Sequence, residues 1–556
     1  MPNGSFSDRL KQSMESAGIK QADLIRLAEN QGKKLGKSQV SQYVSGKTIP
    51  RKDVLEVLAL VLDVDQDWLL DGVGEQETSE RLQGAAVQDR EVSVFPSFEI
   101  PKSDVAADAL PADSGSWERS PDNVSSSSTL FNENHSQEAA SRTIDQRSTV
   151  MGMREFKKSS KLDNVLYDVR GPVADEAARM EGNGQHILKL NIGNPAPFGF
   201  RTPFEVVQDM RQQLPECEGY SDSRGLFSAR KAIMQYAQIK HIPNVGMDDI
   251  YTGNGVSELI NLCMQALLDS GDEVLIPSPD YPLWTACVTL SGGTPVHYIC
   301  DEEAEWYPDI ADIESKVTPR TKAIVIINPN NPTGAVYPRE VLQEIVEVAR
   351  RHQLIIFSDE IYDRLCMDGV EHVSIAELAP DLPCVTFSGL SKSHMIAGYR
   401  IGWMIFSGEK KCIKDFMLGV NMLSNMRLCS NVPAQSIVQT ALGGHQSVKD
   451  YVIPGGRVYE QRNFVYEALR NMEGVSVVKP KAAFYIFPKL DVKKFGITDD
   501  EQFALDLLHQ KKILITRGGG FNWHKPDHFR IVYLPRIEVL SQAMEELGDF
   551  LEHYHQ

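Results

Sequence analysis

The feature that most constrains the fold is an alternation of short β-rich runs and amphipathic segments beyond about residue 150. The β-rich runs are 272–277 (DEVLIP), 323–328 (AIVIIN), 354–359 (LIIFSD) and 385–389 (VTFSG). Segments of helical length separate several of them, for example 341–352 (VLQEIVEVARRH). This alternation predicts an α/β fold in which helices cover both faces of a mainly parallel sheet. Polar groups that act together should lie at strand ends and in the following loops.

A chain of 556 residues is too long for one hydrophobic core, so more than one folded unit is expected. Residues 5–72 carry short helical patterns with glycine turns, which predict an all-α bundle. From 73 to 152 the periodicity stops and polar residues and prolines dominate, so a flexible, disordered linker is expected there. The α/β unit then spans 153–556.

The composition argues against several classes of protein. No apolar run is long enough to span a bilayer, and the start MPNGSFSDRL does not read as a secretory signal, so a cytoplasmic protein without membrane contact is expected. The eight cysteines are scattered without paired spacing and are expected to be reduced thiols. His553 and His555 lack acidic or cysteine partners at metal-ligand spacing, so no metal site is expected.

Four motifs follow one another in the third segment. They are YTGNGVSEL (251–259), a glycine turn that opens a helix; IINPNNPTG (326–334); SDEIYD (358–363), which ends a strand; and FSGLSKSHMIAGYRIGW (387–403). Each motif alone is weak evidence, because an isolated lysine is usually a solvated charge and NPTG is usually a turn. Their joint occurrence in this order carries the interpretation.

With these motifs, the chain from about residue 153 to its end resembles the class I aminotransferases, which depend on pyridoxal 5′-phosphate (PLP). Residues 154–173, 190–200, 219–233 and 279–284 are most similar to bacterial alanine aminotransferases. The resemblance implies the PLP-dependent transferase fold of type I, with a large, mainly parallel sheet domain and a small α+β domain. It also implies amino-group transfer between amino acid and 2-oxo acid substrates, with PLP as the cofactor.

The resemblance assigns the cofactor's ring to a few side chains. Lys392 would carry PLP as a Schiff base and later move a proton, and Asp359 would keep the pyridine nitrogen protonated. Tyr362 and Asn331 would donate hydrogen bonds to the phenolic oxygen of the ring. Tyr281 would stack on the ring face; an ordinary core aromatic is the alternative interpretation of this residue.

The resemblance also assigns the cofactor's phosphate to a helix amino terminus and a fixed positive charge. The residues are Gly255 and Val256, through their backbone amides, and Ser257, Ser391 and Arg400, through their side chains. Many family members carry a serine three residues before the lysine. This chain has Gly389 there, as the alanine-type enzymes do.

Substrate and subunit contacts follow from the same resemblance. Arg530 in DHFRIVYLP (527–535) would bind the α-carboxylate of the substrate, together with Asn331 and a backbone contact at Gly193. Tyr220 corresponds to a tyrosine that reaches the phosphate from the second subunit, so a homodimer is implied.

Residues 5–72 resemble the helix-turn-helix domain of phage repressors, through a helix that opens at Gln21, a second helix over 38–43, and the segments SGKTIP and WLLDG. Residues 20–52 hold eight Lys or Arg against two acidic residues, a local excess that suits contact with DNA phosphates. The resemblance implies contact with DNA bases by Lys37, Ser38, Gln39 and Gln42, and with phosphates by Gln21 and Lys47. A helical bundle for protein contacts is the alternative.

Two functions therefore stay open. The first is an active aminotransferase that moves an amino group between alanine or a related amino acid and 2-oxoglutarate or pyruvate, fused to a DNA-binding module. The second is a transcription regulator whose aminotransferase-like half senses PLP or an amino acid. Because a candidate is present for every catalytic role, the sequence favours the enzyme.

Overall fold

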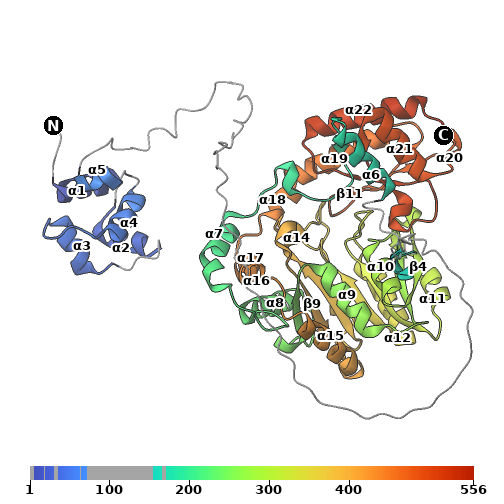
Figure 1. Cartoon of the computed structure of the whole chain (residues 1–556), viewed down its shortest axis with the longest axis horizontal. Coiled ribbons are helices and arrows are strands. Elements are labelled where there is room, and N and C mark those ends of the chain that lie inside the picture. The colour runs from blue at the N-terminus through green and yellow to red at the C-terminus, as the bar shows by residue number, and fades with distance from the viewer. Residues whose placement is uncertain are drawn as a thin grey trace, which may run out of the picture. The chain divides into compact units, whose positions relative to one another are not determined.

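The computed structural model describes residues 5–17, 19–30, 35–62, 64, 66–71, 155–163, 165 and 171–556. The segment expected to be a linker, 73–152, lies outside these residues. The chain divides into two units, Met1–Ile144 and Asp145–Gln556, and each is described by itself (Figure 1).

The amino-terminal unit consists of short helices packed around one core, as the periodicity predicts. The helices are α1 (Phe6–Ser16), α2 (Gln21–Asn30), α3 (Lys37–Val44), α4 (Lys52–Leu62) and α5 (Gln66–Asp71). Leu10, Leu24, Leu58 and Leu69 bury their side chains completely at its centre. Arg9 joins the two ends of the unit, because its Nε donates to the carbonyl oxygen of Leu69 at 3.1 Å.

The carboxyl-terminal unit is built on an eight-stranded sheet with the order β2-β9-β8-β7-β6-β3-β4-β5. The strands are β2 (Ile250–Gly253), β3 (Glu273–Ser278), β4 (Thr294–Asp301), β5 (Tyr307–Pro308), β6 (Thr321–Ile327), β7 (Ile355–Asp359), β8 (Cys384–Gly389) and β9 (Gly402–Ser407). The five strands β4, β3, β6, β7 and β8 run parallel, and the three others pair antiparallel at the edges. The predicted mainly parallel sheet is confirmed.

Helices cover both faces of this sheet, because successive strand residues point to opposite sides. Leu275 of β3 belongs to the core on one face, together with side chains of α8 (Phe227–Ile239) and α12 (Arg339–His352). Val274 and Ile276 belong to the core on the other face, together with side chains of α9 (Val256–Leu267), α10 (Leu283–Leu290) and α15 (Lys414–Met426). Within the described ranges, no helix is long and apolar enough to cross a membrane.

The small domain gathers around a third core next to the large sheet (Figure 1). Its longer helices are α6 (Pro172–Gly182), α19 (Arg457–Arg470), α21 (Asp500–Lys511) and α22 (Ile537–His553). Its strands are β1 (Leu188–Lys189), β10 (Val475–Ser476), β11 (Tyr485–Ile486), β12 (Lys489–Leu490), β13 (Ile513–Leu514), β14 (Thr516–Arg517) and β15 (Phe529–Val532). Shorter or peripheral helices of the unit are α7 (Phe204–Gln213), α11 (Ile310–Lys316), α13 (Ile375–Leu378), α14 (Leu390–Ser393), α16 (Val432–Ser436), α17 (Val438–Gly443), α18 (Val448–Val452) and α20 (Val492–Phe495). Strand β15 lies between β11 and β14.

Candidate active site

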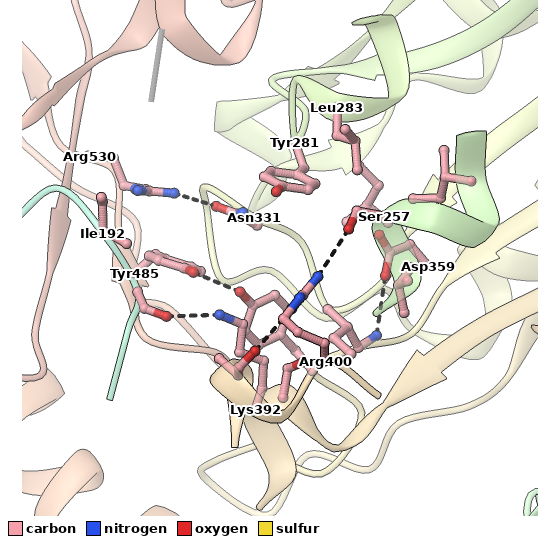
Figure 2. Close-up of a pocket in the computed structure, with 18 residues that line it drawn as sticks. Ile192, Ser257, Tyr281, Leu283, Asn331, Asp359, Lys392, Arg400, Tyr485 and Arg530 are labelled. Atoms are coloured by element: carbon pink, nitrogen blue, oxygen red, sulfur yellow. Dashed lines mark hydrogen bonds between the residues drawn. The ribbon is translucent and has the colours of Figure 1, made fainter. Parts of the chain in front are cut away.

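The carboxyl ends of the central parallel strands open onto a pocket whose other wall is the small domain (Figure 2). Eleven of the residues predicted for the catalytic site line this pocket: Gly193, Val256, Ser257, Tyr281, Asn331, Asp359, Tyr362, Ser391, Lys392, Arg400 and Arg530. Two predicted residues do not line it. Gly255 lies buried directly behind it, and the side chain of Tyr220 is 81% exposed on the surface of the chain.

Lys392 lies in the short helix α14, which begins directly after β8. The preceding Gly389 lies so close to β9 that a Cβ there would approach the carbonyl oxygen of Ile401 to 2.8 Å. A side chain at this position would therefore push β8 and β9 apart. The Nζ of Lys392 donates to the carbonyl oxygen of Gly193 at 2.8 Å, so its amine faces the pocket and the segment that enters the small domain.

Asp359 ends β7 and is only 4% exposed. Its carboxylate accepts hydrogen bonds from Trp284 Nε1 at 3.2 Å and from the backbone amide of Ile361 at 3.3 Å. Burial raises the pKa of this carboxyl to about 6, since no cation of the described chain forms an ion pair with it. The pocket thus contains a buried acid that a cationic neighbour would stabilise.

Arg400 and the start of α9 form an anion cradle on the large-domain side. The Nη2 of Arg400 donates to the Ser257 hydroxyl at 3.2 Å and to the carbonyl oxygen of Asn254 at 3.0 Å. Gly255 precedes α9 with a φ of 84°, a conformation that favours glycine, and a Cβ there would displace the Arg400 guanidinium. The first amides of a helix, a hydroxyl and a guanidinium together suit a phosphate group.

Arg530 lies on β15 on the opposite side of the pocket from Asp359 (Figure 2). Its guanidinium is held between the rings of Tyr485 and Phe521, at 4.3 and 4.5 Å from their centroids. Nη1 donates to Asn331 Oδ1 at 2.9 Å, and Nη2 donates to the carbonyl oxygen of Asn191. Stacking and hydrogen bonds therefore fix a rigid donor fork that is 2% exposed.

Tyr485 and Trp284 are two site residues that the sequence analysis missed. Tyr485 lines the pocket, and its hydroxyl lies 2.7 Å from that of Tyr362. Trp284 supplies the side-chain donor to Asp359. Tyr485 belongs to the apolar run AAFYIFP (482–488), which reads as an ordinary core strand, and Trp284 lies in the PDYPLW motif, of which only Tyr281 was assigned.

The residues predicted to contact DNA lie in the other unit, on and beside α2 and α3. The exposed ones are Gln21, Lys37, Ser38, Gln42 and Lys47. Gln39 differs, because it is half-buried and its Nε2 donates to the hydroxyl of Tyr43 at 2.8 Å. Its side chain is thus engaged within α3 in the free protein.

Residues 185–547 match the family model for aminotransferases of class I and II. The chain belongs to this family. The glutamate-pyruvate aminotransferase AlaA of Escherichia coli K12 is 58% identical over 404 residues, which cover 73% of this chain and 100% of that protein. An alanine aminotransferase of Mycobacterium tuberculosis H37Rv is 56% identical over 404 residues, 72% of this chain and 94% of that protein.

Solved structures agree with the family. An aminotransferase from E. coli superposes with a TM-score of 0.72 at 58% identity and covers 72% of this chain and 100% of its own. The alanine aminotransferase of Pyrococcus furiosus superposes with a TM-score of 0.68 at 38% identity, and the match covers 71% of this chain and 100% of that structure. Class I aminotransferases use PLP, so this member is a PLP-dependent enzyme.

The pocket fits that cofactor by its own chemistry. PLP carries an anionic phosphate, a basic ring nitrogen and an aldehyde that reacts with an amine. The cradle of Arg400 and Ser257, the buried carboxylate of Asp359 and the amine of Lys392 offer one complementary group for each of these.

Proposed function

We propose that the carboxyl-terminal unit transfers the amino group of alanine to 2-oxoglutarate, which yields pyruvate and glutamate. The observation that carries the proposal is the single pocket that contains an amine, a buried carboxylate and a ring-stacked guanidinium, on Lys392, Asp359 and Arg530. The choice of substrates is supported by the names of the relatives, which are glutamate-pyruvate and alanine aminotransferases.

In this proposal the chain's residues hold the cofactor and move one proton. PLP, when bound, withdraws electrons from the bond between Cα of the amino acid and its hydrogen. Asp359 keeps the pyridine nitrogen protonated, because its buried carboxylate favours a cationic neighbour. Tyr362 and Asn331 donate to the phenolic oxygen, and Tyr281 stacks on the ring.

The remaining contacts fix the phosphate and the reacting amine. The phosphate is held by the amides of Gly255 and Val256 and by the side chains of Ser257, Ser391 and Arg400. Lys392 attaches the cofactor. When it is not holding the cofactor, this amine would take the proton from Cα of the substrate.

Arg530 binds the α-carboxylate of the amino acid in this scheme. Its fork can make two parallel charge-assisted bonds, and the rings of Tyr485 and Phe521 keep the fork in place before substrate arrives. Asn331 already accepts from Nη1 and therefore orients the guanidinium, and Gly193 adds a backbone contact.

A second copy of the chain is proposed to complete the site. Large apolar side chains are exposed on the carboxyl-terminal unit, among them Phe204 at 72%, Phe227 at 70% and Met426 at 77%. The loop that follows Tyr220 lies against α15, because Ser223 Oγ donates to Asn425 Oδ1 at 2.6 Å. A homodimer would cover this apolar surface and bring Tyr220 to the partner's phosphate.

Alanine is expected to be the better donor when it is compared with tyrosine and phenylalanine, with kcat/KM at least about tenfold higher. The measurement is turnover of purified full-length protein with PLP and 2-oxoglutarate, followed as pyruvate for alanine and as glutamate for every donor. Reactions without 2-oxoglutarate are the control. Faster turnover with an aromatic donor would assign the enzyme a different substrate class.

We propose DNA binding as a second function, carried by the amino-terminal unit. Helix α3 buries Val40 and Tyr43 and exposes Ser38, Ser41 and Gln42, which share one face because they are three and four residues apart. Exposed Lys37 begins α3, and exposed Lys47 follows the end of this helix. Short polar side chains between two cations suit the major groove and its phosphates. Gln39 would have to leave Tyr43 to reach a base.

In gel-shift assays, full-length protein is expected to bind a subset of genomic fragments, and the double variant Lys37→Glu/Lys47→Glu is expected to lose at least about tenfold in affinity at low salt. The control is Lys11→Glu/Lys161→Glu, which makes the same charge change at two exposed lysines that are not part of α3. Equal binding by both double variants would contradict the assignment, and the unit would then be taken as a protein-contact bundle. If the protein showed no aminotransferase turnover but its DNA binding changed when PLP was added, the transcription regulator would be favoured instead.

A further inference from the structure

Tyr485 lines the pocket, and its hydroxyl has no role in the proposed reaction. It begins β11 at the edge of the small-domain sheet and is 3% exposed. Its hydroxyl lies 2.7 Å from that of Tyr362, and its ring lies beneath the Arg530 guanidinium at 4.3 Å. It also packs against Gly193, where a Cβ would collide with the phenol. Tyr485 therefore contacts both Tyr362, which is proposed to bind the cofactor, and Arg530, which is proposed to bind the substrate.

The pair of phenols has only two hydrogens to share. Burial raises the pKa of Tyr362 well above its ordinary value, so Tyr362 keeps its proton at neutral pH. A phenol donates one hydrogen bond. If Tyr362 donated its proton to Tyr485, it would have none left for the phenolic oxygen of PLP.

We propose that Tyr485 is a positioning residue: it donates its hydroxyl proton to Tyr362 and thereby directs the Tyr362 proton toward the phenolic oxygen of the cofactor. This inference rests on the proposed function. The Arg530 guanidinium over the Tyr485 ring draws electron density from that phenol and favours it as the donor of the pair. A donor that itself accepts a hydrogen bond is strengthened, so Tyr362 binds the ionised phenolic oxygen more tightly.

The test is Tyr485→Phe, which keeps the ring beneath Arg530 and removes only the hydroxyl. The measurement is the visible absorbance of the bound cofactor as a function of pH, without substrate. Weaker donation by Tyr362 disfavours the ionised phenolic oxygen of the cofactor. The pH at the midpoint of the absorbance change is therefore expected to rise by about half a pH unit or more. If Tyr362 instead donates to Tyr485, removal of the hydroxyl frees the Tyr362 proton and the midpoint falls. A fall, or no change, overturns the proposal.

Tyr533→Phe is the matched control. It removes a buried hydroxyl from the same domain, one that lies within hydrogen-bond distance of the carbonyl oxygens of Ala482 and Ala483 and belongs to a residue that does not line the pocket. Its midpoint should equal that of wild type. In a Tyr362→Phe background, Tyr485→Phe should cause no further shift, because the coupling passes through Tyr362.

The outcomes separate this inference from the function on which it rests. A wild-type protein that acquires no visible band with PLP overturns both. A normal wild-type band with an unshifted Tyr485→Phe midpoint overturns only the role of Tyr485. Loss of the cofactor from Tyr485→Phe would make Tyr485 a structural residue and also overturns that role.

Discussion

Lys392→Ala is expected to lower the rate of pyruvate formation from alanine by at least about 10⁴-fold. Lys392 is the only lysine among the residues that line the pocket of the described chain, so no other amine there can attach the cofactor or take the proton from Cα. Overall folding should survive, because the Lys392 side chain is only partly buried and makes one hydrogen bond, to Gly193. The measurement is coupled turnover at saturating PLP.

Lys411→Ala is the control for this loss, since Lys411 is an exposed lysine outside the pocket. Its turnover should equal that of wild type. If Lys392→Ala turned over at the wild-type rate, the role assigned to the Lys392 amine would be wrong.

Asp359→Asn is expected to lower kcat by about 10³-fold while cofactor stays bound. A neutral amide cannot hold the pyridine nitrogen protonated, whereas the phosphate cradle is untouched. The measurements are kcat and the visible absorbance of bound PLP in the same preparation. Near-normal turnover would take this role away from Asp359.

The same variant should stabilise the protein when no cofactor is present. Burial raises the pKa of Asp359 from 3.8 to about 6, so the folded state holds this proton more tightly than the unfolded state. Stability therefore falls as pH rises through the window from about 4 to 6, and the full penalty, up to about 3 kcal/mol, is present above it. Asp359→Asn removes the penalty. Its gain in Tm over wild-type apoprotein should be larger at pH 8 than at pH 5, and an equal gain at both would contradict the argument.

Much of the fold and most of the site could be predicted from the sequence. Strands β3 and β6 to β8 lie within two residues of the predicted runs, because buried strands bounded by turns leave a strong local pattern. The site residues on these strands were found for the same reason. Asp359, Asn331 and Lys392 each lie within a contiguous motif that spans the end of a strand.

The missed residues act through contacts that no local pattern records. Tyr485 meets Tyr362 across 123 positions, and Trp284 meets Asp359 across 75. An aromatic residue in an apolar run looks the same whether it packs in the core or lines a pocket. Gln39 shows the converse, since its position on α3 suggested an outward side chain, but Tyr43 one turn later offers it a partner.

The most direct test of the central claim is to map where PLP is attached and whether substrates change it. Holoprotein is reduced with borohydride and digested, and the mass of each lysine peptide is measured. The account predicts a pyridoxyl group on the peptide that contains Lys392, its loss when alanine is added before reduction, and its return when 2-oxoglutarate follows. Attachment to another lysine, or labelling of Lys392 that alanine leaves unchanged, would contradict it.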